Sequence, residues 1–303
     1  MREHLEELGR IDLLAKKIVA GYMAGLHRSP YNGFSVEFSE HRQYNTGESV
    51  KNIDWKLYAK TDKLYTKLYE EETNLKARIF LDVSGSMNYP ERIPGKAYSK
   101  VEFAAFATAA LTEVLRTQGD AFEVLSFSDA IQFKSQLGST QRHQGFIFQY
   151  LDSLVRDIAF NKVSDGTNIL HALQKMAEEK HKRNLIIIFS DFLIPESALP
   201  EWEQTLEMLS YYGHELLCFN CRHESEDKLQ LESKFYKLVD LESGDEVRIH
   251  GDDWSEAEQE MLNKNTTRLK SAVLGKKFDW VDCPVQLGFG QVLRPYFAAR
   301  KKK

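Results

Sequence analysis

The chain has 303 residues, which is enough for one large domain with additions or for two domains. Hydrophobic residues make up 42% and charged residues 28%, proportions that are ordinary for a globular protein and exclude disorder as its main state. The formal net charge of -5 argues against a general affinity for nucleic acid.

The three cysteines are too few, and odd in number, for a disulfide framework, which favours a reducing compartment. Cys218 and Cys221 form a lone CxxC within an apolar run that reads as a buried strand, so a structural zinc site is weakly supported. The charged N-terminus does not resemble a secretory signal, and no apolar run reaches the roughly 20 residues that a membrane helix needs. We therefore predict a cytoplasmic protein without a membrane span.

The first part of the chain shows helical spacing and then strand-like alternation. Apolar residues recur with helical periodicity over residues 5–26, which predicts an amphipathic helix. Alternating patterns then predict strands over residues 34–38 and 64–69, separated by a turn at residues 45–48. We expect residues 1–76 to form this N-terminal helix and a small β-rich appendage.

From residue 77 onward, short apolar runs alternate with helical patterns. Strands are predicted over residues 79–81, 122–127, 185–189, 215–219, 236–239 and 247–249. Helices are predicted over residues 100–116, 145–154, 168–180, 202–211 and 255–272. Ser99 and Glu102 have capping-box spacing at the start of the first of these helices. This order predicts a doubly wound, mostly parallel sheet flanked by helices over residues 77–303, with a C-terminal helical extension.

Oxygen-bearing side chains follow two of the predicted strands, and ligands of open α/β sheets bind at such carboxyl ends. Asp82, Ser84 and Ser86 follow the first strand, Asp191 follows the strand over residues 185–189, and Thr167 opens the helix between them. Carboxylates and hydroxyls suit Mg²⁺, or Mn²⁺ or Ca²⁺, better than zinc. The alternative interpretation is a simple turn at Ser84 and Ser86 and a helix cap at Asp191.

The pattern Asp82-x-Ser84-x-Ser86, then Thr167, then Asp191 resembles the metal-ion-dependent adhesion site of the von Willebrand factor A family. The resemblance implies that fold for residues 77–303. It also implies that the three hydroxyls contact the ion directly, whereas the two carboxylates act mostly through water.

Residues 38–56 resemble the signature of the bacterial domain-of-unknown-function family 58. Arg42, Tyr44, Asp54 and Trp55 match its pattern, and an acidic stretch follows at residues 70–72. The lysines between residues 51 and 67 form either a solvated face or a surface for an acidic partner. We take Arg42, Tyr44, Asp54 and Trp55 as candidate partner-binding residues.

The two resemblances imply a non-enzymatic, metal-dependent adaptor that works with a MoxR-type AAA+ ATPase and with other von Willebrand factor A proteins. The alternative is a magnesium-dependent hydrolase, similar to a phosphoesterase, that uses the same site. The sequence shows no adjacent nucleophile or base, and no GxSxG. A nucleotide-binding domain is disfavoured because no glycine-rich phosphate loop follows Leu81.

Overall fold

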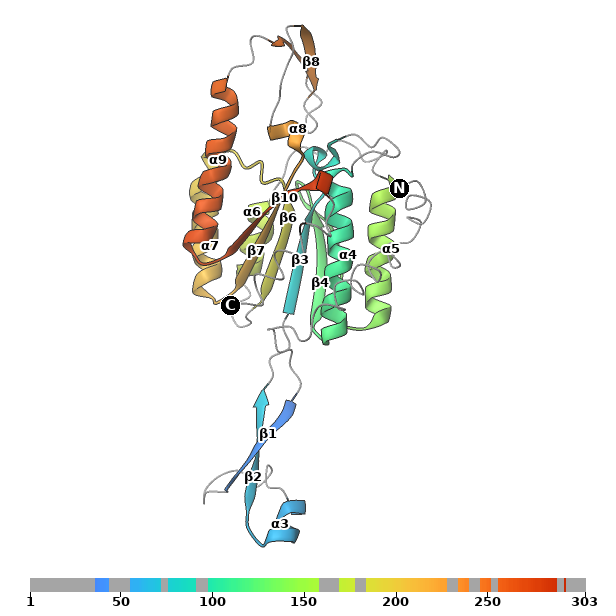
Figure 1. The fold of residues 1–303 in the computed structure, drawn as a ribbon, viewed down its shortest axis with the longest axis vertical. Coiled ribbons are helices and arrows are strands. Elements are labelled where there is room, and N and C mark those ends of the chain that lie inside the picture. The colour runs from blue at the N-terminus through green and yellow to red at the C-terminus, as the bar shows by residue number, and fades with distance from the viewer. Residues whose placement is uncertain are drawn as a thin grey trace.

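A computed structural model describes residues 36–43, 55–71, 76–90, 98–157, 169–177, 184–227, 234–239, 246–251, 256–287 and 292. A six-stranded sheet forms the centre of the described chain, with the strand order β10-β7-β6-β3-β4-β5 (Figure 1). Its strands are β3 (Lys76–Asp82), β4 (Ala121–Phe127), β5 (Ile131–Lys134), β6 (Leu185–Ser190), β7 (Glu215–Arg222) and β10 (Asp279–Pro284). All neighbouring strands run parallel except β4 and β5, so the predicted mostly parallel sheet is confirmed.

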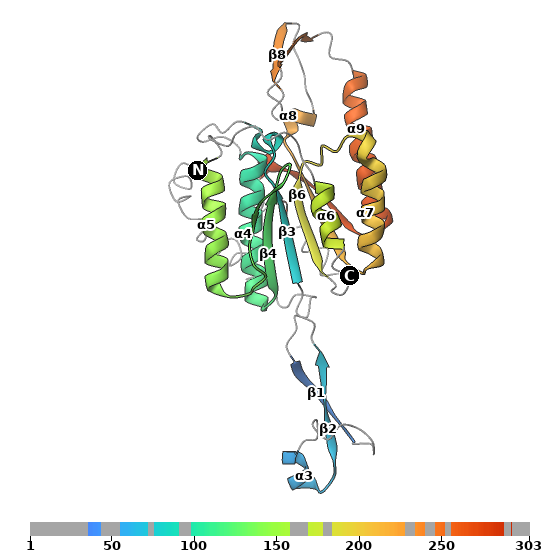
Figure 2. The same cartoon turned by 180° about the vertical axis from the view of Figure 1, so that it is seen from behind.

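Helices cover both faces of this sheet, as Figures 1 and 2 show from opposite sides. The helices α4 (Lys100–Gln118) and α5 (Gln141–Asp157) lie on one face. The other face carries α6 (Ile169–Ala177), α7 (Leu199–Tyr211) and α9 (Glu256–Gly275).

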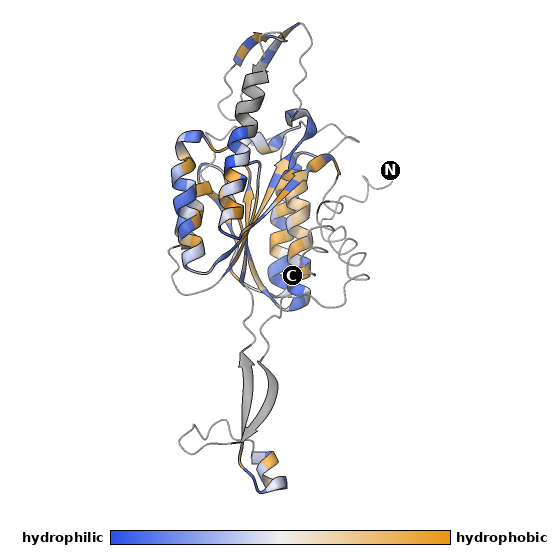
Figure 3. Ribbon diagram, turned by 60° about the vertical axis from the view of Figure 1, so that its left-hand side comes forward, coloured by the Kyte–Doolittle hydropathy of each residue, from blue (hydrophilic) through white to orange (hydrophobic). Residues whose placement is uncertain are grey.

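Alternate residues of the strands supply two hydrophobic cores, one beneath each helical layer. Ile79 and Leu81 of β3 pack with the α4 side, whereas Phe80 between them packs with the α7 side. All six residues of β6 are buried, because a parallel strand covered on both faces has no solvent-facing side. Figure 3 shows the resulting concentration of apolar residues in the central strands.

The helix α4 begins and ends with two recognisable capping signals. The Ser99 hydroxyl accepts a hydrogen bond from the Glu102 backbone amide at 3.2 Å, and the Glu102 carboxylate accepts one from the Ser99 amide at 3.0 Å. This reciprocal pair confirms the predicted capping box. Gly119 ends the helix with φ of 80°, a left-handed conformation that glycine adopts without steric cost.

The described chain also contains two small antiparallel sheets that are separate from the central sheet. The first pairs β1 (Val36–Gln43) with β2 (Tyr65–Glu71), and the short helix α3 (Trp55–Thr61) lies between them in the chain. The second pairs β8 (Phe235–Val239) with β9 (Glu246–His250), after the one-turn helix α8 (Glu224–Asp227). Among the described residues, three short 3-10 turns complete the elements: η3 (Gly85–Asn88), η4 (Glu196–Ala198) and η6 (Val285–Leu287).

Some predicted elements differ from those observed. The strand predicted over residues 34–38 is too short at its end, since β1 (Val36–Gln43) continues to residue 43; residues 34 and 35 lie outside the described residues. The helix predicted at residues 145–154 begins earlier and ends later as α5. The elements α3, α8, β5 and β10 were not predicted. The predicted helix at residues 5–26 and the turn at residues 45–48 lie outside the described residues. The division of the chain at residue 76 stays a prediction.

The strand order creates one place where a ligand site is expected. The chain leaves β3 through α4 on one face of the sheet to reach β4, and it leaves β6 through α7 on the opposite face to reach β7. Since β3 and β6 are neighbours, their following connections diverge at the carboxyl ends of these strands, and such a switch point is where open α/β sheets bind ligands.

Candidate metal centre

Four of the five predicted metal ligands meet at this switch point. Asp82 is the last residue of β3, and Ser84 and Ser86 lie in the turn that follows it. Asp191 directly follows β6, the neighbouring strand. All four side chains are buried. The fifth predicted ligand, Thr167, lies outside the described residues.

Asp82 is held by hydrogen bonds from both strand ends. Its Oδ1 accepts a bond from the Ser84 backbone amide at 3.0 Å, which closes the turn after β3. Its Oδ2 accepts a bond from the Ser190 hydroxyl at 2.6 Å, which links β3 to β6. A carboxylate fixed on both oxygens cannot rotate freely, so Asp82 is positioned before any ligand arrives.

The two predicted serine ligands face one another across the turn. The Oγ atoms of Ser84 and Ser86 lie 3.2 Å apart and share one hydrogen bond. Each hydroxyl oxygen has two lone pairs, so accepting or donating this bond leaves acceptor capacity for a cation. The backbone supports the arrangement, because the Ser84 carbonyl accepts a bond from the Met87 amide at 3.1 Å.

The residue after Asp191 has an unusual backbone conformation. Phe192 has φ of 51°, in the left-handed region that bulky residues rarely adopt. Its amide donates to the Ser190 hydroxyl at 3.0 Å, and its ring packs against Trp202 and Trp280, with centroid separations of 6.0 and 4.8 Å. These contacts offset the backbone strain and fix the bend that carries Asp191.

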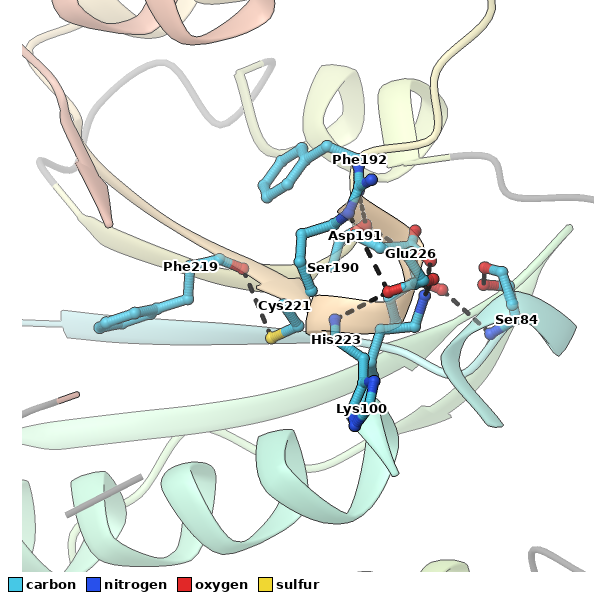
Figure 4. A network of polar contacts seen from close by, with 12 residues as sticks. Ser84, Lys100, Ser190, Asp191, Phe192, Phe219, Cys221, His223 and Glu226 are labelled. Atoms are coloured by element: carbon cyan, nitrogen blue, oxygen red, sulfur yellow. Dashed lines mark hydrogen bonds and ion pairs between the residues drawn. The ribbon is translucent and has the colours of Figure 1, made fainter. Parts of the chain in front are cut away.

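Two further charged residues, not identified from the sequence, belong to the site (Figure 4). Lys100, the first residue of α4, is wholly buried at 0% exposure. Its Nζ donates to Asp191 Oδ2 at 2.7 Å and to Glu226 Oε1 at 2.5 Å. Glu226, on α8, also accepts a bond from the His223 backbone amide at 2.8 Å. The site therefore joins the ends of three parallel strands and the start of α4.

The charges in this cluster do not balance. Burial, and then the charge of Asp191, raise the pKa of Asp82 to about 7, despite the hydrogen bonds that favour its ionised form. Burial lowers the pKa of Lys100, but the neighbouring Asp191 and Glu226 carboxylates outweigh it, and its pKa lies above the ordinary value. With all groups ionised, three carboxylates face the Lys100 ammonium and the Arg222 guanidinium, whose Nε lies 4.0 Å from Glu226 Oε2, which leaves one negative charge uncompensated.

A divalent cation fits this donor set. It would neutralise the excess charge, and the ligands offered are carboxylate and hydroxyl oxygens, which Mg²⁺, Mn²⁺ and Ca²⁺ prefer. Among the described residues, no group of three or more His, Cys, Asp or Glu side chains could hold a metal. Cys218 and Cys221 are buried thiols on β7, as predicted for strand cysteines. A cation site here thus depends on the serine hydroxyls together with Asp82 and Asp191.

The predicted partner-binding residues fall in the less completely described N-terminal region. Tyr44 and Asp54 lie outside the described residues, and Arg42 belongs to β1, where only the backbone is described. Trp55 begins α3 with 59% of its surface exposed, and its ring meets that of Tyr58 edge to face at a centroid separation of 6.2 Å. Within the described ranges, no helix has the length and apolar character that crossing a bilayer requires.

Comparison with known families decides where the chain belongs. Residues 40–266 match the family described as "Protein of unknown function DUF58". The chain belongs to this DUF58 family. The match includes residues 40–56 of the predicted signature, both strand ends of the candidate site, Lys100 and Glu226, so the resemblance to family 58 is confirmed.

Relatives of this DUF58 chain occur in mycobacteria. The uncharacterized proteins Rv1480 of Mycobacterium tuberculosis and Mb1516 of Mycobacterium bovis are each 23% identical to it over 189 residues, or 62% of this chain. The matched region spans only 57% of the length of each relative.

Two solved structures show weak likeness. The pilus adhesin SpaC of Lactobacillus rhamnosus GG gives a TM-score of 0.42 at 10% identity, covering 77% of this chain and 31% of the adhesin. An uncharacterized membrane-spanning protein of Vibrio fischeri gives a TM-score of 0.22 at 14% identity, covering 74% of this chain and 98% of that protein. Both scores are too low to carry a conclusion about fold or function.

Proposed function

We propose that this DUF58 chain is a non-enzymatic interaction module with a von Willebrand factor A-type fold that binds one Mg²⁺ ion through Asp82, Ser84, Ser86, Thr167 and Asp191. The observation that carries the proposal is the meeting of Asp82, Ser84, Ser86 and Asp191 at the carboxyl ends of the neighbouring strands β3 and β6. The strand order and the single antiparallel edge strand support the same fold.

The partner is proposed to complete the shell of the ion. Mg²⁺ takes near-octahedral coordination and usually retains several waters, so one position can accept a carboxylate from another protein. We propose that a MoxR-type AAA+ ATPase supplies it, and that other von Willebrand factor A proteins join the assembly. The chain's own residues hold the ion and orient it toward the partner.

Titration calorimetry with MgCl₂ on the full chain tests the metal site, with the Asp82→Ala protein as the comparison. We expect saturable, one-site binding that the substitution removes. Purified MoxR-type ATPase from the same source is then tested for complex formation in Mg²⁺ and in EDTA. Equal complex formation in both, or by the Asp82→Ala protein, contradicts a metal-bridged interface.

The competing hypothesis is a magnesium-dependent, phosphoesterase-like hydrolase that uses the same oxygen ligands. Such an enzyme would activate a metal-bound water for attack on the substrate. Turnover of p-nitrophenyl phosphate by the purified chain in Mg²⁺, absent in the Asp82→Ala protein, would favour the hydrolase over the interaction module.

Mg²⁺ affinity is expected to weaken as the pH falls below about 7. The pKa of Asp82 in the metal-free protein is about 7, so below that value a proton must leave before the ion binds. The affinity should fall by up to about tenfold per pH unit below pH 7, and level off above it. Calorimetric titrations from pH 5.5 to pH 8.5, about 1.5 units on either side of the pKa of Asp82, measure how the Mg²⁺ affinity depends on pH. A flat profile across that range would show that no carboxyl in the site releases a proton.

The substitution Trp55→Ala is expected to weaken the complex with the ATPase without altering stability. None of the side chains of α3 is buried, and Trp55 is mostly exposed, so its removal should change the free energy of unfolding by less than about 0.5 kcal/mol. Exposed aromatic residues are enriched among interface residues that dominate binding, where truncation costs about 2 kcal/mol or more. Tyr211→Ala, on α7 and 84% exposed, is the matched control. Equal weakening by both variants, or by neither, would count against Trp55 as a contact.

A further inference from the structure

Lys100 is a buried cation inside a site that is proposed to bind a cation. We propose that Lys100 is a positioning residue of the metal centre: its ammonium competes with the divalent ion for Asp191, and Glu226 sets how strongly it does so. The inference rests on the proposed metal site and extends it to two residues that neither the sequence motif nor the family match assigns.

The ammonium of Lys100 is fixed where it stands. It donates to Asp191 at 2.7 Å and to Glu226 at 2.5 Å, and it lies 5.9 Å from the centroid of the Tyr89 ring. The backbone amide of Lys100 also donates to the Tyr89 carbonyl at 2.9 Å. Because the side chain has no exposed surface, it cannot move into solvent without opening the site.

Asp191 cannot bind the Lys100 ammonium and the divalent ion at full strength at the same time. Both are positive, and both would lie close to one carboxylate in a buried region, where charge repulsion is screened far less than in water. Binding of the ion therefore weakens the bond between Lys100 and Asp191, and that bond in turn lowers the affinity for the ion. This reciprocity follows from linkage between two binding equilibria.

Glu226 gives the displaced ammonium an alternative partner. One carboxylate oxygen of Glu226 accepts from Lys100, and the other accepts from the His223 amide, so the group stays in place after β7. When the ion takes Asp191, Lys100 keeps Glu226 as its counter-charge. When the charge of Glu226 is removed, Asp191 is the one carboxylate of these two that still pairs with Lys100. Lys100 then competes more strongly with the divalent ion for Asp191.

Two substitutions consequently have opposite expected effects on Mg²⁺ binding. Lys100→Met keeps the length of the stem and removes the charge, so it should tighten Mg²⁺ binding by about tenfold or more. Glu226→Gln should weaken binding by about tenfold. The control is Lys270→Met, which removes a lysine from an exposed ion pair with Asp282 and should leave the affinity unchanged. A purely structural role of Lys100 predicts looser binding after its substitution.

The experiment is calorimetric titration of MgCl₂ into the full-length wild type and these three variants. Suppose that the wild type binds Mg²⁺ and that the folded Lys100→Met protein binds it equally or more weakly. This result overturns the inference about Lys100 but supports the proposed metal site. If the Lys100→Met protein does not fold, the Glu226→Gln protein tests the inference instead. Unchanged or tighter Mg²⁺ binding by Glu226→Gln would overturn it. Absence of Mg²⁺ binding in the wild type and in every variant overturns the proposed metal site and this inference with it.

Discussion

Asp82→Asn is expected to abolish Mg²⁺ binding and, at the same time, to raise the unfolding temperature of the metal-free protein. The pKa of Asp82 is raised to about 7 because its charge is buried beside that of Asp191. An unfolded aspartate has a pKa of about 3.9, so between roughly pH 4 and pH 7 the folded state retains a proton that the unfolded state has lost. Stability contributed by this group therefore falls as the pH rises through that window.

The amide of asparagine carries no charge and keeps an oxygen to accept the bond from the Ser84 amide. Above pH 7 the gain should be about 1–3 kcal/mol, less than the full pKa difference implies, because the Ser190 hydroxyl must find a new arrangement. Thermal unfolding in EDTA at pH 7.5 (about half a unit above the pKa), paired with MgCl₂ titration, measures both effects. Glu207→Gln, at an exposed ion pair with Lys276, is the control and should alter neither. A less stable variant that still binds Mg²⁺ would contradict both halves of the prediction.

Trp202→Ala is expected to lower the free energy of unfolding by about 3–5 kcal/mol. Trp202 has no exposed surface and lies on α7, where it packs against Phe192. The truncation removes the buried indole and leaves a cavity that the surrounding sheet and helices can fill only partly. Urea unfolding should show a lower midpoint with an unchanged slope.

The same substitution should also weaken Mg²⁺ binding, because Trp202 supports the strained bend that follows Asp191. Trp202→Phe should recover part of the lost stability, since it restores an aromatic ring against Phe192. The Trp55→Ala protein is the comparison, because it loses an exposed tryptophan and keeps the core intact. A destabilisation below about 1 kcal/mol would show that the α7 side of the core does not depend on this ring.

Sequence patterns predicted four of the six strands of the central sheet, namely β3, β4, β6 and β7, because a parallel strand covered on both faces is apolar along its length. The edge strands β5 and β10 were missed. The run Leu185–Ser190 is apolar up to its last residue, and all six of its residues are buried in β6. The strand β5 escaped prediction because it is a four-residue edge strand: Ile131 and Phe133 alternate with polar residues, but the pattern is short and only Phe133 is partly buried. Helix α3 escaped for a similar reason, since none of its residues is buried.

The candidate site was predictable only where a motif marks it locally. The spacing of Asp82, Ser84 and Ser86 is visible in five residues of sequence, and Asp191 follows a recognisable strand. Lys100 carries no such signal: it looks like an ordinary lysine in the first turn of a helix. Its partners lie 91 and 126 residues further along the chain, and only the crossing of α4 over the sheet brings them together.

Because the residues of the site are far apart in the sequence, they are synthesised at different times. Its charged groups come from residues 82, 100, 191 and 226, so a growing chain on the ribosome exposes Asp82 and Lys100 long before Asp191 and Glu226 exist. Until β6 inserts beside β3, Lys100 has neither of these counter-charges and Asp82 lacks the Ser190 hydroxyl. A nascent or truncated chain that ends before residue 191 therefore cannot assemble the proposed cation site, because two of its four charged groups are missing.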